Sequence, residues 1–229
     1  MYKRKDRAND ETRPITAKAG IIKNADGSGY FKIGKTEAYA AVYGPRNLYP
    51  KFMQNPTTGI LRVNYSMMPF SGSGERVRPG PNRRAREISL VTEKALLPVL
   101  DLTEFPNAVI DVFIELPQTD AGTRCAGICA AAIALADAGF NMKDLVAAVS
   151  VGVINGTVIV DLNYEEESYE GEVVDMPVAV LPRTGEISLL QADGILTKEQ
   201  MKVALELAKK TAKKIYEIQK KALKDKYKV

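Results

Sequence analysis

The spacing of hydrophobic residues along the chain alternates between the period of strands and that of helices. Alternating or β-branched apolar residues predict strands over residues 20–25, 29–33, 36–43, 59–67, 108–116, 145–154, 157–162, 173–181 and 187–192. Asp26-Gly27 and Asn155-Gly156 interrupt this pattern, and each pair predicts a hairpin turn. Residues 69–81, which are rich in proline and glycine, predict a loop.

Three segments have the features of helices instead. Residues 85–97 place their apolar side chains on one face, while residues 122–139 are small and apolar on every side and predict a buried helix. Residues 197–227 begin with Thr197, a favourable N-cap, and carry Glu199 in the first turn. The resulting order, ββββ-α-β-α-ββ-ββ-α, predicts an α+β fold in which helices pack on a mixed sheet.

Length and composition limit the class of protein. With 229 residues and 45% hydrophobic content, the chain can bury the core of one domain or of two small fused ones. No apolar run approaches the ~18 residues that a membrane span needs, and the charged first ten residues do not resemble a signal peptide. We therefore expect a soluble cytoplasmic protein without a membrane partner.

Charge and histidine content narrow the possible chemistry. The formal charge of +4 is concentrated at the C-terminus, where residues 198–229 hold 11 lysines and four acidic residues. A basic helix of this kind is usually a solvated face, so net charge alone is weak evidence for nucleic-acid binding. The chain has no histidine and two cysteines, which excludes histidine-assisted nucleophiles and the usual zinc sites. Catalysis would have to use carboxylates, arginines, backbone amides or a bound ion.

Arginines gather at the start of the first predicted helix. The segment Pro79-Gly-Pro-Asn-Arg83-Arg84-Ala-Arg86 places guanidinium groups beside the free backbone amides of a helix N-terminus. Such a helix end suits phosphodiester oxygens. The alternative is a solvated helix start that binds no ligand.

A second candidate site lies at the entrance of the buried helix. The segment Gln118-Thr-Asp120-Ala-Gly122-Thr123-Arg124-Cys125 combines Arg124 with the free N–H groups of a helix N-terminus, which together would bind an anion. Alternatively, Asp120 or Thr123 caps the helix and Arg124 pairs with a carboxylate. Cys125 and Cys129 are interpreted as small buried apolar residues.

The third cluster is the acidic segment 165–175. Most of its carboxylates are expected in a surface loop. Asp175 differs because it falls inside an apolar strand, so it lies either at an exposed edge or in a site.

A set of short motifs, in a fixed order along the chain, resembles one protein family. The motifs are Glu11-Thr-Arg-Pro, Ala25-Asp-Gly-Ser, Val42-Tyr-Gly-Pro-Arg46, Met68-Pro-Phe-Ser, Pro79-Gly-Pro-Asn-Arg-Arg, Val109-Ile-Asp-Val-Phe-Ile-Glu, Asp120-Ala-Gly-Thr-Arg124, Ala134-Leu-Ala-Asp-Ala-Gly, Asp144-Leu-Val-Ala-Ala, Asp175-Met-Pro and Leu189-Leu-Gln-Ala-Asp-Gly. This set resembles the RNase PH family of 3′→5′ exoribonucleases, and more narrowly the catalytic ring subunits of archaeal exosomes.

The resemblance implies a fold like the second domain of ribosomal protein S5. It implies RNase PH-like subdomains at residues 14–145 and 146–213, with the basic helix at 198–229. It also implies a trimer-of-dimers ring with an inactive paralogue, bound by RNA-binding cap proteins. The expected reaction is phosphorolysis, in which inorganic phosphate attacks the 3′-terminal phosphodiester of single-stranded RNA and releases a nucleoside diphosphate.

The resemblance also assigns roles to residues of the candidate sites. Thr123, Arg124 and the Cys125 amide would bind the attacking phosphate. The RNA backbone would be held by Arg83 and Arg84, with Arg86 beside them, and a carboxylate near Asp175 would protonate the leaving oxygen. Arg46 and residues 49–55 match the region that narrows the ring channel. No tightly bound cofactor or metal-ligand set is implied; inorganic phosphate is the co-substrate, and Mg²⁺ near the acidic residues is a candidate ion.

The sequence departs from the family pattern in two places. The usual Asp-Gly-Arg is Asp6-Arg7 here, without the glycine. The family also has a second Asp six residues before Asp175, where this chain has Tyr169. Its acidic segment is about two residues longer, and the nearest substitutes are Glu167 and Glu170. Glu167, which would share the site with Asp175, is the substitute that we prefer.

The sequence leaves two alternatives open. One is a homohexameric RNase PH that trims tRNA 3′ ends. The sequences of such enzymes, however, lack the Gly-Pro-Arg and Met-Pro-Phe-Ser motifs in the form found here. The other is a non-catalytic ring subunit that only binds RNA. Four retained residues argue against a non-catalytic subunit, namely Arg83, Arg84, Arg124 and Asp175, and the altered acidic segment argues for it.

Overall fold

The computed structural model describes residues 2, 4, 6–73, 77–80 and 82–227. A five-stranded sheet is formed by β1 (Ile15–Ala19), β2 (Gly27–Ile33), β3 (Thr36–Asn47), β4 (Ile60–Met67) and β5 (Ala108–Gln118). A four-stranded sheet follows, formed by β6 (Ala147–Ile154), β7 (Thr157–Val160), β8 (Val173–Leu181) and β9 (Glu186–Leu190). The spatial orders are β1-β2-β3-β5-β4 and β7-β6-β8-β9. Strand β4 runs parallel to β5, and the other pairs are antiparallel.

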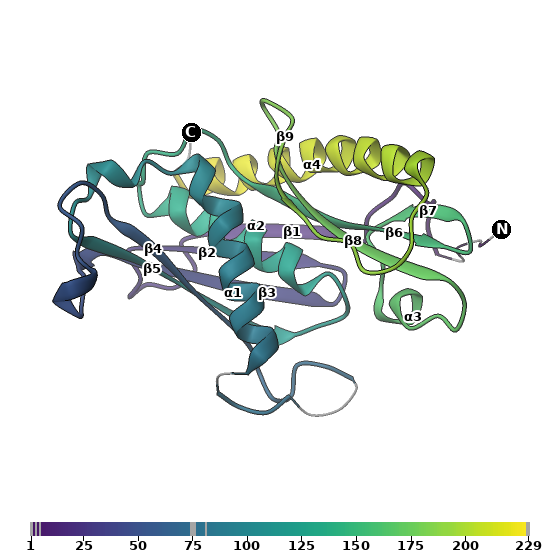
Figure 1. The fold of residues 1–229 in the computed structure, drawn as a ribbon, viewed down its shortest axis with the longest axis horizontal. Coiled ribbons are helices and arrows are strands. Elements are labelled where there is room, and N and C mark those ends of the chain that lie inside the picture. Colours follow the sequence, from purple (N-terminus) through teal and green to yellow (C-terminus); the bar gives the residue numbers. More distant parts are fainter. Residues whose placement is uncertain (1, 3, 5, 74–76, 81, 228–229) are drawn as a thin grey trace.

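Helices pack against both sheets (Figure 1). They are α1 (Arg83–Leu96), α2 (Thr123–Asp137), α3 (Tyr164–Glu167) and α4 (Lys198–Tyr227), with short 3₁₀ turns at Lys51–Met53, Leu97–Val99 and Leu102–Glu104. Helix α2 contacts strands of both sheets, α1 lies against β4, and α4 packs on β6 and β1. The α+β class predicted from the order of elements is confirmed.

Helix α2 approaches the five-stranded sheet closely enough to require glycine there. A Cβ on Gly29 would lie 2.3 Å from the Ala130 carbonyl oxygen, and one on Gly27 would lie 2.2 Å from the Ala138 nitrogen. Nearly all of the helix is buried, as its apolar composition predicts. Its small residues therefore bring the helix backbone against the sheet, which fixes the place of its N-terminus.

The structure confirms some of the predicted turns and strands and corrects others. The Asn155-Gly156 turn between β6 and β7 has φ of 45° and 77°, as the predicted two-residue hairpin requires. The strand predicted at residues 20–25 is wrong: this stretch is a turn that begins at Gly20, and the partner of β2 is β1. In the predicted 69–81 loop, residues 74–76 and 81 lie outside the described residues; the others have no regular structure.

Helix α3 corrects part of the prediction that most carboxylates of the acidic segment lie in a surface loop. The Asn163 side chain accepts a hydrogen bond from the Glu166 N–H at 2.9 Å, and the Glu166 carboxylate accepts one from the Asn163 N–H at 3.0 Å. This reciprocal capping box closes a single helical turn. None of the helices in the described part of the chain is long and apolar enough to span a membrane.

Candidate active site

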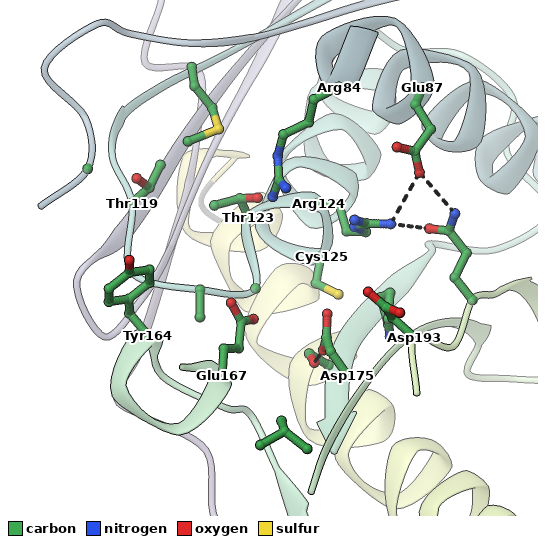
Figure 2. A pocket seen from close by; sticks show the side chains of 18 of the residues that line it. Arg84, Glu87, Thr119, Thr123, Arg124, Cys125, Tyr164, Glu167, Asp175 and Asp193 are labelled. Carbon is green, nitrogen blue, oxygen red and sulfur yellow. Dashed lines mark hydrogen bonds and ion pairs between the residues drawn. The ribbon is translucent and has the colours of Figure 1, made fainter. Parts of the chain in front are cut away.

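A pocket of about 780 Å³ opens where the N-terminus of α2 faces α1, α3 and β8. Its lining brings together six of the residues singled out in the sequence: Arg84, Thr123, Arg124, Cys125, Glu167 and Asp175. Figure 2 shows Arg84 and Arg124 on one side of the pocket, with the Glu167 and Asp175 carboxylates on the other. Segments far apart in the sequence thus place cationic and acidic groups around one cavity.

The α2 N-terminus is shaped by a turn with two left-handed residues. Ala121 has φ of 58° and Gly122 has φ of 61°. The Thr36 hydroxyl holds this turn, since it donates to the Ala121 carbonyl at 2.7 Å and accepts from the Asp120 N–H at 2.9 Å. The first intrahelical bond runs from Ala126 N to Gly122 O at 3.1 Å. The N–H groups of the first helical turn are thereby directed at the pocket.

The described residues supply no side-chain cap for α2. Asp120, one of the two caps considered, has its carboxylate engaged elsewhere: it accepts from Tyr164 N at 3.1 Å and lies 3.3 Å from an Arg13 nitrogen. An uncapped helix start that faces a cavity has free donors and a positive dipole end. This is the arrangement that binds phosphate or another oxyanion.

The guanidinium of Arg124 is held at the edge of the pocket by two neighbours (Figure 2). Its Nη1 donates to Gln191 Oε1 and lies 3.7 Å from a Glu87 carboxylate oxygen. The Gln191 amide in turn donates to Glu87 at 3.3 Å. Arg124 therefore does pair loosely with a carboxylate, as the alternative predicted. It still lines the pocket despite this pairing.

Asp175 reaches the pocket from the interior of the four-stranded sheet. It lies opposite Gly152 of β6 in the register of β8, and the Ser150 hydroxyl donates to its carboxylate. Its backbone N–H and carbonyl exchange hydrogen bonds of 3.1 and 2.9 Å with Asp193. Burial raises the pKa of Asp175, and the Ser150 hydrogen bond and the charge of Arg124 oppose that rise.

Glu167 is the last residue of α3 and lines the same pocket. Burial, followed by the negative charge of Asp175, raises the pKa of Glu167 to about 7, while the Gly122 N–H and Arg84 act in the opposite direction. Glu170 is exposed and lies outside the pocket lining. Tyr169, at the spacing of the family's second Asp, packs edge-on against Tyr2 with ring centroids 5.6 Å apart.

The remaining predicted RNA-binding arginines lie away from this pocket. Asn82 caps α1 by accepting from Ala85 N at 2.7 Å, and Arg83 at the helix start is exposed. Arg86 lines a shallow groove between α1 and β4. Arg46 lies near the end of β3, with its guanidinium carbon 4.8 Å from the centre of the Tyr43 ring.

Several polar residues of the pocket were not singled out from the sequence. Ser150, Gln191 and Asp193 are the main ones. Ser150 is a lone polar residue in an apolar strand, and the other two belong to the Leu189-Leu-Gln-Ala-Asp-Gly motif. The sequence therefore contained a feature that could have marked each of them as a candidate site residue. In the described part of the chain, no three His, Cys, Asp or Glu side chains are placed to hold a metal ion.

Two thiols lie on α2, and one of them, Cys125, lines the pocket. Burial raises the pKa of the Cys125 thiol well above its usual range, and it raises that of Cys129 to about 12. Both thiols are free and buried. They therefore stay protonated at neutral pH, which agrees with their interpretation as small apolar residues.

Comparisons with known proteins identify the family of the chain. Residues 11–141 match the 3′ exoribonuclease family, domain 1, and residues 144–211 match domain 2 of that family. The exosome complex component Rrp41 of Pyrococcus furiosus is 56% identical over 217 residues, which cover 95% of this chain and 86% of the relative. The corresponding component of Methanopyrus kandleri is 49% identical over 221 residues, which cover 96% and 91%.

Solved structures share the fold at lower sequence identity. Rice Rrp46 superposes with a TM-score of 0.82 at 23% identity, covering 95% of this chain and 98% of the rice chain. A chain of the Archaeoglobus fulgidus exosome with RNA bound to the active site gives a TM-score of 0.78 at 22% identity, covering 92% and 90%. The two matching domain descriptions cover most of the sequence, and the chain therefore belongs to the RNase PH family of 3′ exoribonucleases.

Proposed function

We propose that this chain is the catalytic ring subunit of an archaeal-type exosome and shortens RNA from its 3′ end by phosphorolysis. One observation carries the proposal: an uncapped helix N-terminus with Arg124 faces two carboxylates across one pocket, and burial raises the pKa of one of these, Glu167, to about 7. The names of the relatives support the exosome context, because each is an exosome complex component.

In the proposed reaction, inorganic phosphate binds the Thr123, Arg124 and Cys125 amides and the Arg124 guanidinium. A phosphate oxygen forms a bond to the phosphorus of the terminal nucleotide, and the bond from that phosphorus to the O3′ of the preceding nucleotide breaks. Arg84 stabilises charge on the scissile group. The products are a nucleoside diphosphate and an RNA that is one nucleotide shorter.

The leaving O3′ needs a proton, and the pKa of Glu167 suits this role. With a pKa of about 7, Glu167 is about half protonated at neutral pH, which suits a general acid. The hydrogen bond from Ser150 and the charge of Arg124 favour the ionised form of Asp175. Asp175 would then raise the proton affinity of Glu167 through its charge, as in other carboxyl pairs with separated pKa values.

The partners follow from the same proposal. Single-stranded RNA would enter with its 3′ end at Arg84, while Arg83 and Arg46, both exposed, would contact the backbone upstream. Arg86 stays a weaker candidate, because it faces the groove beside β4. The inactive paralogue, the cap proteins and a role for Mg²⁺ remain predictions, as does a cytoplasmic location.

The proposal is tested with the chain alone and with its candidate ring partner. RNA labelled in every backbone phosphate is incubated with and without inorganic phosphate, and released nucleotides are separated by chromatography. We expect nucleoside diphosphates that depend on phosphate, and we expect Glu167→Gln to abolish their release while the exposed-site control Glu170→Gln does not. Equal release of monophosphates in phosphate-free buffer would contradict phosphorolysis.

A further inference from the structure

Helix α3 presents two neighbouring carboxylates to opposite sides. Glu167 lines the pocket, whereas Glu166 points into the protein and is 4% exposed. A one-turn helix has too few backbone hydrogen bonds to hold its own place. Contacts made by its side chains must therefore decide where the Glu167 carboxyl lies.

Glu166 makes contacts with the N-terminal segment of the chain. The Arg4 guanidinium donates to both Glu166 oxygens, at 2.7 and 2.9 Å, and Arg7 donates to one of them at 3.3 Å. The same carboxylate closes the capping box with Asn163 N at 3.0 Å. The Arg4 side chain is 1% exposed, so this ion pair is shielded from water. A buried pair of this kind adds little net stability compared with apolar packing, but it fixes geometry.

The same arginines tie α3 to the turn before α2. Arg4 and Arg7 both donate to the Asp161 carbonyl, at 2.9 and 2.6 Å. The Asp161 carboxylate accepts from Arg13 at 2.7 and 3.0 Å, and Arg13 lies 3.3 Å from the Asp120 carboxylate. Asp120 also accepts from the first backbone N–H of α3. One network thus joins the segment that carries the acid to the helix end that would bind the phosphate.

We propose that Glu166, Arg4 and Arg7 are positioning residues that hold the Glu167 carboxyl at its working distance from the anion site. This inference rests on the proposed function, because it concerns the acid of that reaction. Among the described residues, Arg4 and Arg7 hydrogen-bond to Glu166, to the Asp6 carboxylate and to backbone carbonyls, none of which would react. They act through Glu166 and α3.

Release of α3 would change both the place and the protonation of Glu167. The charged groups that face Glu167 are Asp175 on β8, Arg84 on α1 and Arg13 in the N-terminal segment, together with the Gly122 N–H. If α3 moved outward, water would reach the carboxyl, and its pKa would fall from about 7 toward the ordinary 4.5. The acid would then lose its proton over most of the neutral range.

The test uses Glu166→Gln in the full chain with its ring partner. Glutamine keeps the side-chain length and can still close a capping box, but it loses the ion pair with Arg4. We expect kcat at pH 7 to fall by about tenfold or more, and the alkaline limb of the kcat–pH profile to move at least about one unit lower. The KM for phosphate should change less than about twofold. The matched control is Glu165→Gln, an exposed neighbour on the same turn, which should leave the profile in place.

Variants of Arg4 provide a second measurement if Glu166→Gln folds poorly. Arg4→Lys keeps the charge without the two-pronged contact and should shift the profile less than Arg4→Met does. An unshifted pH profile in both Glu166→Gln and Arg4→Met would overturn the positioning role. Glu167→Gln separates this failure from that of the proposed function: if it stays fully active, Glu167 is not the acid. If it is inactive while the other variants keep the wild-type profile, only the positioning role is wrong.

Discussion

Replacing Glu167 by glutamine should make the protein more stable above neutral pH while it removes activity. The reason is the direction of the pKa shift: burial and Asp175 raise the folded-state pKa from 4.5 to about 7. Between these values the folded state binds more protons than the unfolded state, so stability falls as pH rises. Glutamine is neutral throughout and lacks this penalty.

The size of the effect follows from the shift. A displacement of roughly 2.5 pKa units, at about 1.4 kcal/mol each, corresponds to about 3 kcal/mol. Because Glu167 is only partly buried, solvent screening reduces this, and we expect about 2 kcal/mol at pH 8. Below about pH 4.5 the carboxyl is protonated in both states, so variant and wild type should converge there.

Urea unfolding at pH 4.5, 6, 7 and 8 measures this difference. The chain has ten tyrosines and no tryptophan, so far-UV circular dichroism and tyrosine fluorescence are suitable probes. All samples need the same chain concentration, because association changes apparent stability. Glu165→Gln is the exposed control and should follow the wild type at every pH. A Glu167→Gln protein that is less stable at pH 8, or whose advantage does not vary with pH, would refute the assignment of a raised pKa.

Three further predictions concern the pocket and the packing of α2 against the five-stranded sheet. Arg84→Ala should weaken RNA binding for every sequence and reduce the log–log salt slope by about 0.7 for each lost phosphate contact; an unchanged slope in salt titrations would show that Arg84 meets no phosphate. Asp175→Asn removes a charge that raises the proton affinity of Glu167, so it should keep its circular-dichroism spectrum and lower turnover at neutral pH; wild-type turnover in a rate assay would remove this carboxylate from the mechanism. Gly29→Ala should lower the free energy of unfolding by about 1–3 kcal/mol, because its Cβ would lie 2.3 Å from the Ala130 carbonyl oxygen; chemical denaturation with an unchanged midpoint would argue against that close approach.

Elements whose signals are local could be predicted from the sequence. The Asn155-Gly156 hairpin and the buried helix α2 depend on residues within one segment, and both were found at the expected places. Strand β1 was missed, because its alternation uses threonine, lysine and small alanines around Ile15, whereas Ile21 and Ile22 made the following turn look apolar.

The structure of the acidic segment could not be predicted from nearby residues alone. The capping box of Asn163 and Glu166 was readable, but four nearby glutamates suggested a solvated loop. The residues that draw Glu166 inward are Arg4 and Arg7, about 160 positions away, and no periodicity reveals such a contact. For the same reason, the sequence offered both Glu167 and Glu170 as acids, and only the three-dimensional arrangement places Glu167 beside Asp175.

The central claim, that phosphate rather than water cleaves the RNA, is tested most directly by following oxygen. The chain with its ring partner degrades RNA in H₂¹⁸O containing saturating ordinary phosphate, and mass spectrometry analyses the released nucleotides. Attack by phosphate predicts nucleoside diphosphates with no ¹⁸O in the newly formed bond. Nucleoside monophosphates that carry one ¹⁸O would show that water is the nucleophile and would contradict the account.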